Sequence, residues 1–279
     1  MQKFNYHQHT YRCGHADNDT SDEDYVLEYI KMGLKKIAFT DHCPEKNRID
    51  KRTHMRMEYS QKDEYLNSVK FLKEKYADKI EIQSGYEVEY LPGEEKNLME
   101  LKNEVDKIIL GQHFIYDKDN NLKIINKHEY TDSDLIKYAE YIKKAIELKI
   151  PNIIAHPDFF MLGRSDFGDT EKEVAYIIFK SAQKNNIPLE INLNDIFKNV
   201  YYENEQIGIL PIKQQKEKLK CIKYPCKEFW KIATEHNVNV IYGLDVHHKG
   251  QILLFNELVK LAEESLGEEI IKNLNFINY

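Results

Sequence analysis

The stretch VNVIYGLDVHH, residues 238–248, decides the fold of this chain. It begins with an apolar run rich in β-branched residues, which predicts a short buried strand. The run stops at Gly243, and Asp245 and His247 follow almost at once. Residues i and i+2 of an extended segment point to the same side. The stretch therefore predicts a buried strand that ends in a carboxylate and an imidazole on one face.

The same succession of an apolar run and a polar motif recurs along the chain. The runs predict seven short strands, at residues 3–7, 35–40, 79–88, 105–113, 152–156, 187–193 and 238–245. Apolar residues at helical spacing predict helices between them, at about 22–33, 60–76, 94–102, 131–148, 170–186 and 225–236, with amphipathic helices closing the chain. Strands that alternate with helices indicate a parallel sheet with right-handed crossovers.

Polar motifs at the strand ends constrain how this sheet closes. An open doubly wound sheet would spread seven strand ends along a line, whereas a barrel gathers them around one point, at the face where such barrels carry their chemistry. We therefore expect a closed or nearly closed α/β barrel. The length of 279 residues is ordinary for one such domain, so we expect a single domain over residues 1–279, with a Lys-rich insertion at about 194–224.

The composition narrows the class of protein. A net charge of −7 disfavours nonspecific binding to nucleic acid, so no bulk nucleic-acid partner is expected. The four cysteines form no CxxC pair, which favours reduced thiols in a cytoplasmic protein. The N-terminus lacks the pattern of a signal peptide, and no apolar run approaches the roughly 18 residues of a membrane helix. We therefore expect no membrane partner.

Histidine is concentrated in the motifs at the strand ends. Seven of the eleven histidines lie there with one glutamate and one aspartate: His7, His9, His15, His42, His113, His156, His247, Glu87 and Asp245. Any one of them alone would more often be a structural residue than a ligand. As a set at successive strand ends they predict a metal site. Mixed imidazole and carboxylate ligands suit zinc, iron or manganese better than magnesium or calcium.

The motifs resemble, in order, those of the PHP (polymerase and histidinol phosphatase) family, in its histidinol-phosphatase branch. HQHTYRCGHA, residues 7–16, is similar to the first motif of that branch, and IAFTDH, GYEVEY, GQHF, AHPD, LEIN and GLDVHH resemble later ones. The match extends over about residues 4–260. The resemblance implies a distorted (β/α)7 barrel with a site for three divalent metal ions.

The resemblance also implies which residues hold each ion. The first ion would be held by His7, His9, Glu87 and Asp245. Glu87 would bridge to a second ion, held by His113 and His156. The third would be held by His15, His42 and His247. All nine positions carry a residue that can bind a metal, which argues against an inactive copy. Catalysis is expected to depend on Glu87, Asp245 and His247 through the ions that they hold.

The activity that the resemblance implies is hydrolysis of a small phosphate monoester by a metal-activated hydroxide. L-Histidinol phosphate, from histidine biosynthesis, is the expected substrate, and another small phosphate monoester or a nucleotide is the alternative. Such esters hydrolyse extremely slowly unaided, and clustered divalent ions can lower the barrier. Two other classes fit less well. A C–N hydrolase of the amidohydrolase type would need a carbamylated lysine at a strand end, and a nonenzymatic metal-binding module would tolerate lost ligands.

Further polar residues are candidates for contact with the substrate. Arg164 follows the fifth strand and could clamp the phosphate as a bidentate donor. Glu190 and Asn192 share a face of the sixth strand, so they could orient a metal ligand or the ammonium group of the substrate. Asp41 is expected to orient a ligand or to cap a turn. His248 is expected to be a neighbour of the site and not a ligand.

The chain departs from the family pattern at the rim of the site. LNDIFKNVYY, residues 193–202, follows LEIN where the family has a glycine-containing turn, and GLDVHH stands where GSDAH is typical. His54 and His128 fall in expected loops that could flank the site, although a surface position is the default for both. The expected metal ligands are unaffected by these departures, whereas the pocket that recognises the leaving group is expected to differ from that of the family. The sequence predicts no oligomeric state.

Overall fold

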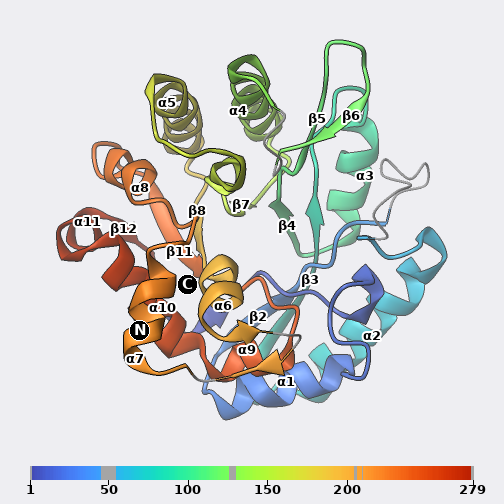
Figure 1. Ribbon diagram of the computed structural model, residues 1–279. Helices are drawn as coiled ribbons and strands as arrows, with labels where there is room; N and C mark the ends of the chain where they lie inside the picture. Colours follow the sequence, from blue (N-terminus) through green and yellow to red (C-terminus); the bar gives the residue numbers. More distant parts are fainter. Residues whose placement is uncertain (1, 45–54, 126–129, 204–205, 209, 278–279) are drawn as a thin grey trace.

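A curled sheet of eight parallel strands forms the centre of the protein (Figure 1). The computed structural model describes residues 2–44, 55–125, 130–203, 206–208 and 210–277. In spatial order the strands are β1 (Phe4–Asn5), β2 (Lys36–Phe39), β3 (Glu81–Val88), β4 (Lys107–Leu110), β7 (Ile153–Ile154), β8 (Leu189–Asn192), β11 (Asn239–Gly243) and β12 (Asn275–Phe276). The first seven are the predicted strands, with shorter bounds, and the predicted distorted α/β barrel is confirmed.

The sheet closes between β1 and β11 through a seam that relies on side chains. The two chains meet as a backbone bridge where Gln8 pairs with Val246. Nearer the amino ends, the side chain of Asn5 accepts a hydrogen bond from the amide of Leu244 at 2.9 Å. The side chain of Gln2 bonds an amide and a carbonyl of β11 at 2.9 and 2.7 Å. These amide side chains satisfy backbone groups that a regular ladder would otherwise pair.

The eighth strand, β12, was not predicted. It pairs with the beginning of β11, with Asn239 opposite Asn275, where the sequence analysis expected only helices. A strand of two residues is too short to produce an alternating pattern, so periodicity could not reveal it.

Helices surround the sheet on its outer side (Figure 1). They are α1 (Asp22–Lys31), α2 (Lys62–Lys75), α3 (Glu95–Glu104), α4 (Asp132–Glu147), α5 (Asp169–Asn185), α8 (Lys227–Ala233), α10 (Phe255–Leu266) and α11 (Glu268–Asn273). Two expected starts carry capping boxes, Ser21 with Asp24 before α1 and Thr131 with Asp134 before α4, and each box satisfies amide groups that the first turn leaves free. None of the described helices is long and apolar enough to cross a membrane.

The apolar core has two layers, and the inner one determines where chemistry can occur. A large cluster fills the space between the sheet and the helices. A smaller cluster fills the inside of the barrel with side chains that include Phe4, Tyr6, Ile109, Ile153 and Ile241. Because the interior is packed, a polar site must lie beyond it, at the ends of the strands.

Two excursions leave the repeating pattern. The hairpin of β5 (Phe114–Tyr116) and β6 (Leu122–Ile124) turns at Asn120, whose φ is 63°, as the Asp-Asn-Asn turn predicts. The predicted insertion contains α6 (Asn194–Val200), β9 (Tyr202–Glu203), β10 (Gln206–Ile207) and α7 (Ile212–Leu219). Short 3-10 helices η1 (Tyr11–Cys13), η2 (Tyr59–Gln61) and η3 (Phe159–Gly163), and helix α9 (Lys249–Leu253), complete the elements used below.

Candidate metal centre

The nine predicted ligands converge at the carboxyl ends of the strands, beyond the packed interior of the barrel. Two of them lie on turns with unusual backbone geometry: φ is 29° at His156 and 50° at Asp245. Positive φ is uncommon for residues other than glycine. Such strained conformations persist where the surrounding structure enforces them, which is common at functional sites.

Four donor atoms gather around one point at the end of β1. His7 Nε2 and His9 Nε2 lie 3.1 Å apart. Both lie 3.1–3.6 Å from Asp245 Oδ1 and Glu87 Oε2. Four tetrahedral donors about 2.1 Å from an ion would be separated from one another by about 3.4 Å. The set expected for the first ion therefore has the spacing that one ion requires.

Glu87 faces a second group of donors with its other oxygen. Its Oε1 lies 3.1 Å from His156 Nε2 and 3.8 Å from His113 Nε2. The two imidazole rings are 4.8 Å apart between centroids. A carboxylate whose two oxygens face separate groups of imidazoles can bridge two cations, which is the arrangement that the family resemblance implies.

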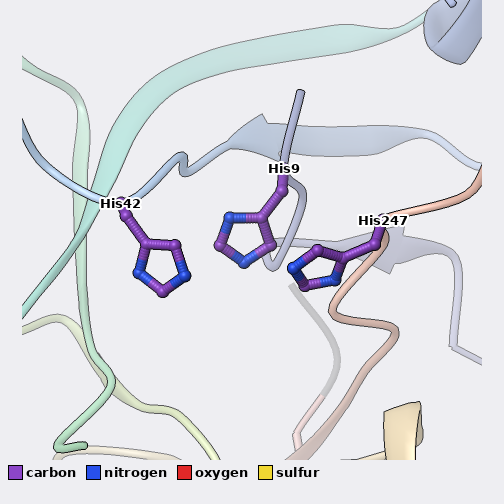
Figure 2. Close-up of side chains that lie close together, drawn as sticks. All are labelled: His9, His42 and His247. Carbon is purple, nitrogen blue, oxygen red and sulfur yellow. The ribbon is translucent and has the colours of Figure 1, made fainter. Parts of the chain in front are cut away.

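The third group is assembled differently from the expectation. His15 Nε2 and His247 Nε2 lie 2.8 Å apart. His42 is set closer to the first group, because its Nδ1 lies 3.0 Å from Glu87 Oε2. His9 stands between the two sides, with ring centroids 4.6 Å from His42 and 4.4 Å from His247 (Figure 2). Donors of His9, His42 and His247 all lie within 4.8 Å of one another, so His9 and His42 join the first and third groups.

An unsatisfied carboxylate oxygen supports cation binding at this point. Glu87 Oε2 is buried and makes no hydrogen bond within the described structure, although nitrogens of His7, His9 and His42 lie within 3.6 Å of it. A buried polar atom without a partner is costly. A cation among these donors would remove that cost, so the donor set fits a metal ion.

The protonation states of four residues of the cluster also suit metal binding. Burial raises the pKa of Glu87, but the imidazoles of His42 and His7 outweigh it and hold that pKa well below its usual value. Burial and the neighbouring imidazoles lower the pKa of His42 and His247 well below the usual value, and that of His15 to about 4. Ionised carboxylates and neutral imidazoles are the forms that bind metals.

Glu190 and Asn192 hold the ligands of the first group in place. Both Glu190 oxygens lie 3.0 Å from His7 Nδ1, which leaves Nε2 directed at the other donors. Although burial opposes it, Asp245, Glu190 and Glu87 together raise the pKa of His7 well above its usual value. Asn192 Nδ2 donates to Glu190 Oε1 at 2.7 Å and to Asp245 Oδ2 at 3.3 Å. Of the two roles expected for this pair, the structure supplies contacts for orienting ligands.

Glu89 plays the corresponding part for the second group, and the sequence analysis missed it. Its Oε1 lies 2.8 Å from His113 Nδ1, and its Oε2 accepts from the His113 amide at 2.8 Å. Arg56 Nη2 donates to the same carboxylate at 3.2 Å. A signal was present in GYEVEY, because Glu89 comes two residues after Glu87, just beyond the end of β3, and residues at this spacing in an extended segment share a face.

Other expected neighbours of the site have local roles. Asp41 accepts from the amide and the hydroxyl of Thr10 at 2.7 Å, so it caps the turn that follows His9. His248 lies 2.7 Å from Asp17 and stacks on Tyr202, with centroids 4.5 Å apart, as a neighbour and not a member of the cluster. His54 and His128 lie outside the described residues.

Arg164 is engaged away from the cluster. Its guanidinium pairs with Glu171 of α5 and with Asp132 of α4. No contact in the described part of the chain joins it to the nine predicted ligands. These pairs fix the segment between η3 and α5 and engage Nε and Nη2 of the guanidinium. The prediction that Arg164 binds the phosphate therefore gains no support from the structure.

Comparison with known proteins identifies relatives. The family model of the PHP domain matches residues 5–194. The histidinol-phosphatase of Bacillus subtilis is 29% identical over 154 residues, which cover 53% of this chain and 57% of that protein. This chain thus matches little more than half the length of that relative. A protein of Deinococcus radiodurans named probable histidinol-phosphatase is 22% identical over 95% of this chain and 94% of its own length.

Solved structures share the fold. The histidinol phosphate phosphatase of Lactococcus lactis, complexed with zinc, L-histidinol and phosphate, superposes with a TM-score of 0.63 at 17% identity, over 94% of each chain. A candidate histidinol phosphatase of Listeria monocytogenes gives 0.69 at 22% identity, over 90% of this chain and 97% of that one. At these identities the likeness establishes the fold. Asp245 and His247 lie beyond the residues that the family model matches, so the structure alone brings them to the other donors.

Proposed function

The chain belongs to the PHP domain family, and on that premise we propose that it is a metal-dependent phosphatase that hydrolyses L-histidinol phosphate to L-histidinol and phosphate. The observation that carries the proposal is the convergence of five histidines on Glu87, each oxygen of which faces a different group of imidazoles. The names of the relatives supply the substrate. The four cysteines of the protein are free, which agrees with a cytoplasmic location.

We assign three divalent ions to the centre. Zinc is the preferred metal for these ions, and iron or manganese is the alternative. His7, His9, Glu87 and Asp245 would hold one ion, and Glu87, His113 and His156 another. A third ion would be held by His15 and His247 together with His42, which also lies beside Glu87 of the first group. Bound divalent ions supply positive charge and Lewis acidity for attack of water on a phosphate monoester.

The residues of the chain itself keep this centre in order. Glu190 and Glu89 fix the tautomers and the ring orientations of His7 and His113. Asn194 Nδ2 donates to Asp245 Oδ2 at 3.0 Å and supports the oxygen that does not face the histidines. Preorganised donors of this kind spare the site from rearranging during the reaction.

The open side of the centre is where a phosphate can approach. His15 is exposed, whereas the other eight donor residues are buried. After burial and the neighbouring imidazoles, the charge of Lys198, an exposed residue of α6, also lowers the pKa of His15 and of His247. We therefore assign a contact with the substrate phosphate to Lys198 ahead of Arg164.

An aromatic wall beside the second group is suited to a flat leaving group. The half-exposed ring of Phe159 lies 4.8 Å from that of His113 and 5.1 Å from that of His156. Tyr224 lies 5.9 Å from Phe159, between centroids. An imidazole could pack against this wall, since ring pairs at 4.5–7 Å are favourable.

The second candidate is a phosphatase for another small phosphate monoester or for a nucleotide. It is favoured by the insertion, since α6 contributes Asn194, which donates to Asp245, in a segment that departs from the family pattern. The discriminating experiment measures phosphate release from a panel of monoesters, after reconstitution with zinc, iron or manganese. Histidinol phosphate should give the highest kcat/KM. Preference for a nucleotide or for p-nitrophenyl phosphate would establish the alternative.

A further inference from the structure

A cavity of about 900 Å³ is lined by residues of α7, the start of α8, the end of α10 and the segment after η3. None of the nine donors of the metal centre lines it. We call it the lysine cavity, because Lys216, Lys220, Lys223 and Lys227 all line it. It is therefore a separate site on the molecule.

Positive charge is concentrated at this cavity. Residues 212–227 contain six lysines and one glutamate, in a chain whose net charge is −7. Lys216 pairs with Glu264 at 3.8 Å, and Lys223 donates to the carbonyl of Arg164 at 2.8 Å. Among the described residues, no carboxylate lies within ion-pair distance of Lys220 or Lys227. These two ammonium groups are available to an anion.

The rest of the lining limits what kind of anion fits. All three of its carboxylates have partners within the lining: Glu264 pairs with Lys216, Asp166 accepts from Ser165 at 2.8 Å, and Glu228 accepts from the Cys226 thiol at 3.6 Å. Met161, Phe167, Leu219 and Ile222 supply apolar surface beside the lysines. A ligand that uses both surfaces must carry an anionic group on an apolar or aromatic body.

The wall of the cavity is tied to the metal centre on two sides. Asp158, two residues after His156, accepts from the amide of Cys226 at 2.7 Å. Asp195 of α6 accepts from the amide of Lys223 at 2.7 Å. Both carboxylates are buried. A ligand that shifts the segment 223–226 would therefore displace the loop that carries His156 and the helix that covers the centre.

We propose that the lysine cavity binds a small organic anion, with an aromatic or apolar body and one or two phosphate, sulfonate or carboxylate groups, and that its occupancy changes turnover at the metal centre. The binding claim is independent of the proposed function. The claim that occupancy changes turnover rests on the proposed function, because it can be measured only if the protein is a phosphatase.

The test uses the full, metal-loaded protein and the fluorescent probe anilinonaphthalene sulfonate. A sulfonate is an anion that the phosphatase cannot hydrolyse. The double variant Lys220→Gln/Lys227→Gln removes the two available ammonium groups. The control Lys213→Gln/Lys218→Gln removes the same charge from the same segment but from residues that do not line the cavity.

We expect saturable binding, weakened about ten-fold in the first variant and almost unchanged in the control. Equal affinity in all three proteins, or equal loss in both variants, would overturn the site. Saturating probe should change kcat for p-nitrophenyl phosphate in the wild type and not in the first variant. An unchanged wild-type kcat would overturn the coupling. Absence of any phosphatase activity would count against the proposed function alone, because the binding titration needs no catalysis.

Discussion

The metal centre and the lysine cavity are assembled in opposite ways. The donors of the centre come from strand ends distributed from His7 to His247, and eight of the nine are buried. The lysines of the cavity come from one stretch, residues 216–227, and three of the four are exposed. Chemistry that depends on many strand ends is protected by the fold, whereas a binding site built from one stretch of chain can be gained or lost through changes in that stretch alone.

The largest effect is expected at the residue on which the centre depends most. Glu87→Gln should reduce phosphatase activity to background, because a neutral amide cannot balance two cations. Circular dichroism should show that the fold is retained. Glu81→Gln is the matched control, since Glu81 lies at the exposed amino end of the same strand, and it should keep full activity. A folded, fully active Glu87→Gln protein would rule out the bridging role.

The carboxylates behind the histidines should matter less than the ligands themselves. Glu89→Gln and Glu190→Gln are each expected to lower activity or metal affinity by about 10- to 100-fold, because they orient His113 and His7. Metal content and kcat/KM measure this. Equal losses for histidinol phosphate and p-nitrophenyl phosphate would agree with the contact to His7. A far greater loss for histidinol phosphate would assign Glu190 to the ammonium group of the substrate.

The seam between β1 and β11 is expected to contribute to the stability of the fold. Asn5 accepts from the Leu244 amide and donates to the His7 carbonyl and the Tyr29 hydroxyl at 2.8–2.9 Å, all buried. Asn5→Ala should lower the free energy of unfolding by about 2 kcal/mol, because buried backbone groups lose their partners. Urea unfolding measures it. The exposed Asn275→Ala should change stability by less than about 0.5 kcal/mol, and equal values for both would remove the special role of the seam.

The smallest effect separates two candidate phosphate contacts. Lys198→Ala should raise KM for phosphate monoesters by about two- to five-fold, as loss of one exposed charge contact would. Arg164→Ala should change KM less and lower stability instead, because its pairs with Glu171 and Asp132 hold the segment after η3. Steady-state kinetics and thermal unfolding of both variants decide the matter. A larger rise in KM for Arg164→Ala than for Lys198→Ala would show that Arg164, and not Lys198, contacts the phosphate.

The fold and most of the centre could be predicted because their signals are local in sequence. Each strand is a short apolar run, and the residue that follows it must lie at one end of the barrel. The positions of His7, Glu87 and Asp245 follow from that rule without any knowledge of side-chain contacts. The strand β12 could not be predicted, because two residues carry no period.

The roles that sequence could not settle depend on partners from distant segments. Arg164 follows a strand like a phosphate contact, but Asp132 and Glu171 engage it from two helices. His42 lies nearer Glu87 than a strict third group would require, because His42, which follows β2, pairs with Glu87 of the neighbouring strand β3 in a backbone bridge. Such outcomes are set by packing between elements, which the pattern along one strand does not encode.

Three groups of donors form a single metal centre in this account: Glu87 bridges the first and second, and His9 and His42 join the first and third. Elemental analysis of protein purified without chelator, with phosphatase activity followed during removal and return of zinc, iron or manganese, tests it most directly. About three ions per chain are expected, with activity lost on chelation and restored on reconstitution. A reproducible single ion per chain, or activity that survives complete removal of metal, would contradict it.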